Sequence, residues 1–277
     1  MTFTVLDAPS NLGLRPPAPG VEPGVRRLAA ALRARGIVER LGARDGGAVP
    51  APPYASSVAE NRAAIPAYTR ALAARIGELL DAGERPLVLG GDCSILLGAM
   101  LALRRRGRYG LAHVDGHLDF RHAGWSGGIG AVAGEDLAAV TGRLEPALSD
   151  IDELGPYVAD ADAVHYGDRE CDPGERAAIA QTQIAVLDLP AVRAGAMKRP
   201  TVPYWVHVDA DVLDSALIPA VDSPAPDGLT FEELSKLLRE LLAGDAIGMQ
   251  VTVFDPDLDP DGSQAQALTD CLVSALL

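Results

Sequence analysis

Two short acidic segments contain the residues best suited to chemistry. In DGHLD (115–119), Asp115, His117 and Asp119 alternate, so an extended segment turns all three side chains to one side. Asp209 and Asp211 repeat this spacing in DAD (209–211). Carboxylates combined with an imidazole suit Mn²⁺, Fe²⁺, Zn²⁺ or Ni²⁺ better than Ca²⁺. Either segment alone is as typical of an exposed turn, but the two together favour a metal site.

Both acidic segments follow short apolar runs rich in β-branched residues, a pattern typical of strands buried on both faces. Such runs occur at 3–10, 85–92, 109–116, 161–168, 183–190, 204–211 and 247–257. Helical patterns lie between several of them, at 24–35, 60–82, 94–106, 230–243 and 263–276. This alternation predicts a parallel sheet covered by helices on both sides. The acidic segments would then meet at the carboxyl edge of the sheet, where ligands gather.

Two segments rich in Pro and Gly, 10–24 and 43–53, interrupt the alternation. Neither separates regions of different composition, so we predict that both are loops at the rim of the sheet. The chain shows no internal repeat. It is therefore expected to form a single α/β domain over residues 1–277.

The composition excludes several classes of partner. The net charge of −14 argues against nucleic acid and against an anionic membrane surface. Only three cysteines occur, Cys93, Cys171 and Cys271, without a CxxC pair, which fits a reducing compartment. No signal-peptide pattern and no apolar run of about 18 residues is present, so we expect a cytoplasmic protein.

Five segments together resemble the signature blocks of the arginase–agmatinase–formiminoglutamase superfamily. They are GGDCS (90–94), DGHLD (115–119), YGDRECDPGE (166–175), DADVLDSALIPAVDSPAPDGLT (209–230) and VFDPDLDP (253–260). The resemblance implies a three-layer α/β/α fold with a mainly parallel sheet of about eight strands. It also implies a hydrolase that cleaves a C–N bond of a small guanidino, amidino or related molecule, and a homo-oligomer, trimeric or hexameric.

The same resemblance implies two Mn²⁺ ions that activate a bridging hydroxide. The metal ligands carried over from the family's motifs are Cys93, Asp115, His117, Asp119, Asp209 and Asp211. Asp115 and Asp209 would bridge the ions, Asp119 would complete the first site, and His117 and Asp211 would belong to the second. Asp172 matches a position that contacts the amino end of the substrate in arginases.

Cys93 stands where the family has a His ligand. As a ligand, its thiolate would favour softer ions such as Zn²⁺ or Fe²⁺ over Mn²⁺, or weaken one site. Two other interpretations stay open at this point: Cys93 could be a small apolar packing residue, or it could be a nucleophile.

Two further departures concern catalysis. The family's proton-shuttling His is absent, because Ala133 or Gly130 falls at its position, depending on the alignment. His122 could act as the general acid/base instead, or could be a surface residue. Val253 falls where a Glu would pair with a guanidinium. L-arginine is therefore not the expected substrate. The alternative to a hydrolase is a non-catalytic relative of the family that binds metal or ligand.

Three more histidines lie in predicted strands. His113 and His207 each precede a predicted ligand Asp by two residues, on the same strand face. They could support the carboxylates, although the sequence favours satisfied core histidines. His165, in another buried-strand pattern, is expected to be structural.

Overall fold

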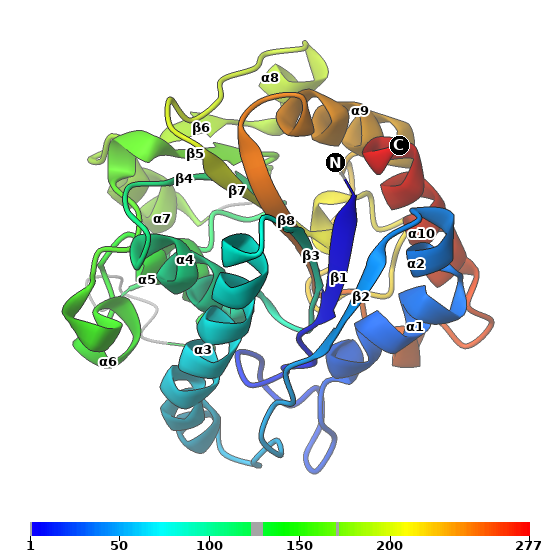
Figure 1. Cartoon of the computed structure of the whole chain (residues 1–277), viewed down its shortest axis with the longest axis horizontal. Helices are drawn as coiled ribbons and strands as arrows, with labels where there is room; N and C mark the ends of the chain where they lie inside the picture. The colour runs from blue at the N-terminus through cyan, green and yellow to red at the C-terminus, as the bar shows by residue number, and fades with distance from the viewer. Residues whose placement is uncertain (1, 123–129, 170–171) are drawn as a thin grey trace.

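The computed structural model describes residues 2–122, 130–169 and 172–277, and one parallel sheet forms its centre (Figure 1). The strands lie in the order β2-β1-β3-β8-β7-β4-β5-β6, and every neighbouring pair is parallel. Their bounds are β1 Phe3–Asp7, β2 Arg44–Ala48, β3 Arg85–Leu89, β4 Gly110–Val114, β5 Ala163–Tyr166, β6 Ala185–Leu187, β7 Tyr204–Asp209 and β8 Ala246–Thr252.

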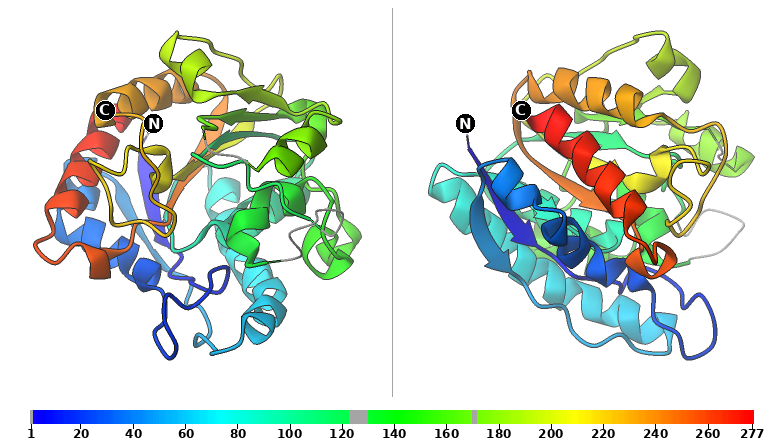
Figure 2. Two further views of the ribbon diagram at one scale, coloured as in Figure 1. Left: turned by 180° about the vertical axis from the view of Figure 1, so that it is seen from behind. Right: turned by 90° about the vertical axis from the view of Figure 1, so that its right-hand side faces the viewer.

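Helices pack on both faces of this sheet (Figure 2). One buried cluster joins α3, α4 and α5 to one face, and a second cluster joins α1, α9 and α10 to the other. The helices are α1 Leu28–Ala34, α2 Ile37–Arg40, α3 Val58–Asp81, α4 Leu96–Arg104, α5 Asp136–Val140, α6 Pro146–Ser149, α7 Pro173–Ile179, α8 Leu189–Arg193, α9 Phe231–Leu242 and α10 Ser263–Leu276. The three-layer α/β/α prediction is confirmed. No helix in the described residues is long and apolar enough to cross a membrane.

The segment 43–53 was predicted to be a rim loop, and the structure corrects this in part. Its first half forms β2, RDGGA, which pairs with β1 at the edge of the sheet. Nearly all of β2 is exposed, so its sequence has neither an apolar run nor an apolar alternation. Charged residues and glycines of this kind are common on edge strands, where they discourage pairing with another chain.

The central strands carry the acidic motifs. β3, β8, β7 and β4 are consecutive in the sheet. At or just after their carboxyl ends they carry, in the same order, the motifs GGDC, TVFD, DAD and DGHLD. β4 and β7 are completely buried. Because all strands are parallel, these four segments come together at one edge.

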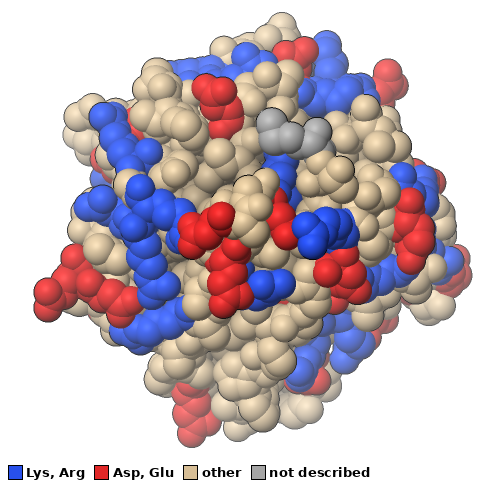
Figure 3. Space-filling view, in the orientation of Figure 1, with Lys and Arg blue, Asp and Glu red and all other residues tan. Residues whose placement is uncertain are grey.

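Much of the negative charge lies inside the molecule. Eleven buried residues in the described part of the chain are acidic, and none is Lys or Arg. The eleven are Asp92, Asp115, Glu135, Asp136, Asp162, Asp168, Glu175, Asp209, Asp211, Asp255 and Asp259. On the face seen in Figure 3, by contrast, acidic and basic side chains are intermixed. Four of the eleven, Glu135, Asp162, Asp168 and Glu175, form ion pairs with arginines, so the charge that still needs compensation is that of the other buried carboxylates.

Candidate active site

The predicted metal ligands meet at the carboxyl edge of the central strands. They make up two of the five groups of donor atoms in the described residues that could hold a metal ion, and within each group all atoms lie within 4.8 Å of one another. The two groups are Cys93, Asp115, Asp209 and Asp115, His117, Asp211. Asp119 lines the same cavity as members of both groups. Because Asp115 belongs to both, the arrangement offers two adjacent cation positions.

Each acidic motif begins with an Asp that closes its own turn. Asp115 Oδ1 accepts a hydrogen bond from the backbone N–H of His117 at 2.7 Å, and Asp209 Oδ1 accepts one from Asp211 at 2.7 Å. Such turns fix the carboxylate at the strand end and leave its second oxygen for another partner. Asp115 Oδ2 is buried and has no hydrogen-bond partner among the described residues. An unpaired buried oxygen costs free energy, and these oxygen and imidazole donors fit a pair of divalent cations.

His117 lies between carboxylates. Its Nδ1 is 3.0 Å from Asp211 Oδ2 and 3.7 Å from Asp115 Oδ1. Burial alone would lower the pKa of His117, but the charge of Asp211 and the hydrogen bonds to both carboxylates outweigh it and raise the pKa to about 11. A metal ion bound at this imidazole must displace that proton.

Cys93 is buried and is held by two oxygens. Its thiol donates to Asp209 Oδ2 at 2.8 Å, and its Sγ lies 3.1 Å from Thr252 Oγ1. Burial raises the pKa of this thiol well above its usual value, and the charge of Asp209 adds to the shift. Nucleophilic cysteines need a lowered pKa, so the burial of Cys93 beside the carboxylate of Asp209 disfavours the nucleophile interpretation.

Three buried histidines form a row across the sheet beneath the predicted ligands. His113 on β4 is in register with His165 on β5 and with His207 on β7. The ring centroids of His113 and His207 are 4.7 Å apart, and Asp136, the first residue of α5, lies 3.1 Å from His113 Nε2. Sequence reasoning missed Asp136. Acidic residues are common at the start of a helix because they stabilise its N-terminus, so Asp136 gave no sign of a role in the site.

His113 has a hydrogen-bond partner at both ring nitrogens, as the core interpretation predicts, whereas His165 and His207 have one only at Nδ1 in the described chain. Within the described chain, His165 Nε2, His207 Nε2 and Asp136 Oδ2 are all buried without a hydrogen-bond partner. Burial, together with the charge of Asp115, raises the pKa of Asp136 to about 6 although His113 opposes this. The row is therefore a polar cluster with unpaired atoms that lies next to the predicted metal ligands.

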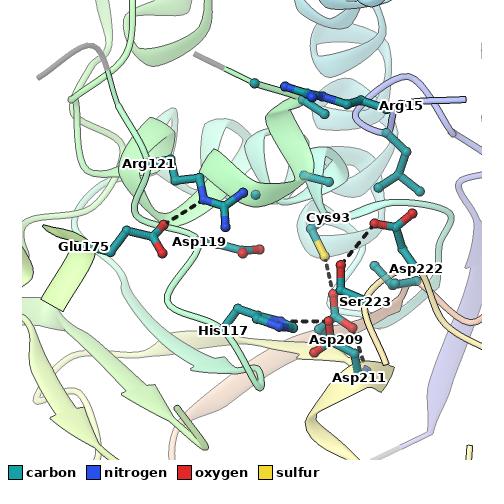
Figure 4. Close-up of a pocket in the computed structure, with 16 residues that line it drawn as sticks. Arg15, Cys93, His117, Asp119, Arg121, Glu175, Asp209, Asp211, Asp222 and Ser223 are labelled. Atoms are coloured by element: carbon teal, nitrogen blue, oxygen red, sulfur yellow. Dashed lines mark hydrogen bonds and ion pairs between the residues drawn. The ribbon is translucent and has the colours of Figure 1, made fainter. Parts of the chain in front are cut away.

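A cavity of about 440 Å³ opens beside the two donor groups (Figure 4). Its wall contains charged residues that sequence reasoning did not select: Arg15, Arg121, Glu175 and Asp222. Arg121 Nε lies 3.3 Å from Glu175 Oε1. Arg15 makes no ion pair with any residue that the structure describes. A cavity of this size suits a small molecule, and both signs of charge are available to bind it.

Two predicted site residues lie elsewhere. His122 is not among the described residues that line the cavity. Its ring packs edge-on against Phe120, with ring centroids 5.8 Å apart. Asp172 is not among the described lining residues either, and it caps α7 by accepting a hydrogen bond from Gly174 N at 2.7 Å. Glu175, three residues beyond Asp172, does line the cavity.

Positions at which the chain departs from the family's motifs do line the cavity. Gly130, Ala133 and Val253 all contribute to its wall, so neither aligned position carries an imidazole there. Val253 has a φ of 72°, although it is β-branched, and its N–H donates to Gly91 O at 2.7 Å. Such strain is tolerated where surrounding structure enforces it, commonly at functional sites.

Comparison with known proteins identifies the family to which the chain belongs. A sequence model described as the arginase family matches residues 2–277. The chain belongs to the arginase family. An arginase of Bacillus caldovelox is 31% identical over 264 residues, which cover 87% of this chain and 86% of that protein. A formimidoylglutamase of Nocardia farcinica is 29% identical over 210 residues, which cover 71% of this chain and 63% of that protein.

A solved structure supports the fold in the same way. The arginase of Bacillus subtilis superposes with a TM-score of 0.87 at 23% identity, covering 100% of this chain and 98% of that chain. The predicted family and the predicted fold are both confirmed.

The pKa of His117 gives a prediction for the metal-free protein. A pKa raised from 6.5 to about 11 in the folded state contributes stability that is complete below pH 6.5 and is lost as the pH rises toward 11. After treatment with a chelator, the melting temperature should fall between pH 7 and pH 9. The His117→Gln variant should show a flatter profile. His122→Gln should keep the wild-type slope, because the pKa of His122 is lowered and its ring is neutral throughout this range. Equal slopes in the wild type and His117→Gln would contradict the assignment.

Proposed function

We propose that this member of the arginase family is a metal-dependent hydrolase that cleaves a C–N bond of a small guanidino, amidino or formimino compound. The observation that carries the proposal is the pair of donor groups that share Asp115 beside a cavity of about 440 Å³. The names of the relatives, arginase and formimidoylglutamase, support the same class of reaction.

The cation pair is proposed to be Mn²⁺. The carboxylates of the two groups, together with His117, form a donor set that Mn²⁺ accepts readily. Bound there, the pair would lower the pKa of a water molecule and polarise the substrate carbon that the water attacks. Asp115, whose Oδ2 is buried without a hydrogen-bond partner in the described chain, is the residue we expect to serve both ions.

The wall of the cavity supports a substrate that carries charges of both signs. Arg15 and Arg121 lie along one side of the cavity in Figure 4 and could bind a carboxylate. Glu175 and Asp222 could bind an ammonium group. An amino-acid-like substrate has both groups, and we propose this class. The acid/base role of His122 and the substrate contact of Asp172 stay predictions.

A non-catalytic relative is the second candidate. It is favoured by one observation, that Gly130 and Ala133 line the cavity where the family's motif would supply a His. Such a protein would bind metal and ligand without turnover. A trimeric or hexameric assembly and a cytoplasmic location also stay predictions from the family resemblance.

Removal of one bridging carboxylate tests the metal site. Asp209→Ala should lose most of the bound Mn²⁺, all turnover in a panel of guanidino, amidino and formimino compounds, and the stabilisation that bound metal provides. Asp81→Ala removes an exposed carboxylate at the end of α3 and should change none of these. Elemental analysis and thermal unfolding are the measurements. Equal metal content in Asp209→Ala and the wild type would refute the site, whereas metal binding without turnover in the wild type would favour the non-catalytic candidate.

The substrate preference gives a separate prediction. A guanidinium that enters this cavity meets Val253 where the family's motif would supply a carboxylate, and an unpaired cation loses solvation worth several kcal/mol. L-arginine should therefore release almost no urea at pH 7 or pH 9 with saturating Mn²⁺. A less basic N-hydroxylated guanidine should be preferred.

A carboxylate placed at this position should reverse the preference. Val253→Glu should bind L-arginine more tightly, which isothermal calorimetry can measure. Leu258→Glu adds the same charge at an exposed position and should not. Wild-type turnover of L-arginine at about 10 per second, an ordinary enzyme rate, would show that another group pairs with the guanidinium.

A further inference from the structure

Three further groups of donor atoms occur among the described residues, and two of them contain His207. The remaining group lies next to the predicted first metal position. It joins His113, Asp119 and Asp136, whose donor atoms all lie within 4.8 Å of one another. Asp119 comes from the DGHLD motif, His113 from the buried part of β4 and Asp136 from the start of α5. The family's motifs assign no metal ligand at the last two positions.

His113 presents one ring nitrogen to these carboxylates. Its Nε2 is 3.1 Å from Asp136 Oδ1 and 3.9 Å from Asp115 Oδ2. Its Nδ1 is 2.9 Å from His165 Nδ1. Beside an ionised carboxylate at 3.1 Å, Nε2 carries a proton, which a metal ion bound there must displace, and Nδ1 can then donate to His165 Nδ1. Imidazoles that bind metals commonly have a hydrogen-bond acceptor of this kind on the opposite nitrogen.

His207 cannot take the same role without rearrangement. The indole N–H of Trp205 can act only as a donor, and it donates to Gln250 Oε1 at 3.1 Å. The amide nitrogen of Gln250 must then donate to His207 Nδ1, at 2.8 Å. Neutral His207 therefore carries its proton on Nε2, which lies 3.7 Å from Asp136 Oδ2. The proton of His207 is thus held on Nε2, whereas the proton of His113 can move to Nδ1, which has an acceptor in His165 Nδ1.

Two buried oxygens around this group lack hydrogen-bond partners in the described chain. They are Asp136 Oδ2 and Asp115 Oδ2, both in completely buried residues. Around a cation with bonds of about 2.1 Å, neighbouring donor atoms lie about 3 to 3.5 Å apart. His113 Nε2 is 3.9 Å from Asp115 Oδ2 and 3.1 Å from the other oxygen of Asp136, Oδ1, to which it is hydrogen-bonded. A cation among these atoms would replace that hydrogen bond and would need only a small adjustment of the spacing.

We propose that the first divalent cation is held by His113 and Asp136 together with Asp115, Asp119 and the bridging Asp209, and that Cys93 is not one of its ligands. The inference rests on the metal pair of the proposed function. It gives the first ion one imidazole and four carboxylates, so His113 supplies the imidazole that Cys93 lacks. Cys93 Sγ instead contacts Asp209 and Thr252 at 2.8 and 3.1 Å. Such a set favours Mn²⁺ or Fe²⁺ over ions that prefer thiolate.

Metal content and Co²⁺ spectra test the proposal without an activity assay. The wild type, loaded with Mn²⁺ and desalted, should hold two ions per chain. His113→Asn and Asp136→Asn should each hold one, whereas Cys93→Ser should hold two. His207→Gln is the matched control, a buried histidine in the same row, and should also hold two. With Co²⁺, the wild type should show no thiolate-to-cobalt charge-transfer absorption.

The outcomes separate this inference from the proposed function. No bound metal in the wild type would overturn both. Two ions in His113→Asn and Asp136→Asn but one in Cys93→Ser, or a charge-transfer absorption that disappears in Cys93→Ser, would overturn this inference alone. If His113→Asn does not fold, as judged by thermal unfolding, Asp136→Asn decides, because it is nearly isosteric.

Discussion

Repulsion among carboxylates that are held together in the interior is the constraint on which this structure depends. Asp115, Asp136, Asp209 and Asp211 are buried at one sheet edge, and in the described chain no Lys or Arg forms an ion pair with them. Burial and mutual charge raise the pKa of Asp209 and Asp211 above the usual range. Only protons or cations can neutralise such a cluster, so its composition already specifies the kind of ligand that belongs there.

The parallel sheet is what makes such a cluster possible. Antiparallel strands would send alternate motifs to opposite edges, whereas here four consecutive strands deliver theirs to one. The turn that follows each strand then uses one carboxylate oxygen to accept a backbone N–H, which fixes the side chain by a local interaction. Two levels of structure, strand direction and turn hydrogen bonding, thus place the same atoms.

The sequence predicted those parts of the fold and the site that follow from local patterns. The buried runs of β4 and β7 and the alternating acidic motifs are visible without a structure, because period and residue type express them directly. β2 was missed because an exposed edge strand has no apolar pattern. The family resemblance added roles for Cys93 and Asp172 that spacing alone could not supply.

The residues that sequence reasoning missed depend on tertiary contacts. Arg15, Glu175 and Asp136 come from separate loops and helix starts, and nothing in their neighbouring residues indicates that they converge. The histidines of β4, β5 and β7 were recognised singly, but their register across the sheet depends on strand order. His122 was selected for its proximity in sequence, and proximity in sequence does not establish that a side chain faces the cavity.

The backbone at Val253 has a consequence for how this protein could diverge. A left-handed φ costs roughly 1–2 kcal/mol for any residue with a Cβ, and β-branched side chains are the least suited to it. Replacing Val253 by an unbranched polar residue would therefore not add backbone strain. Its side chain nevertheless forms part of the cavity wall. Because Val253 also belongs to the buried core, a substitution there changes core packing together with the substrate preference proposed above.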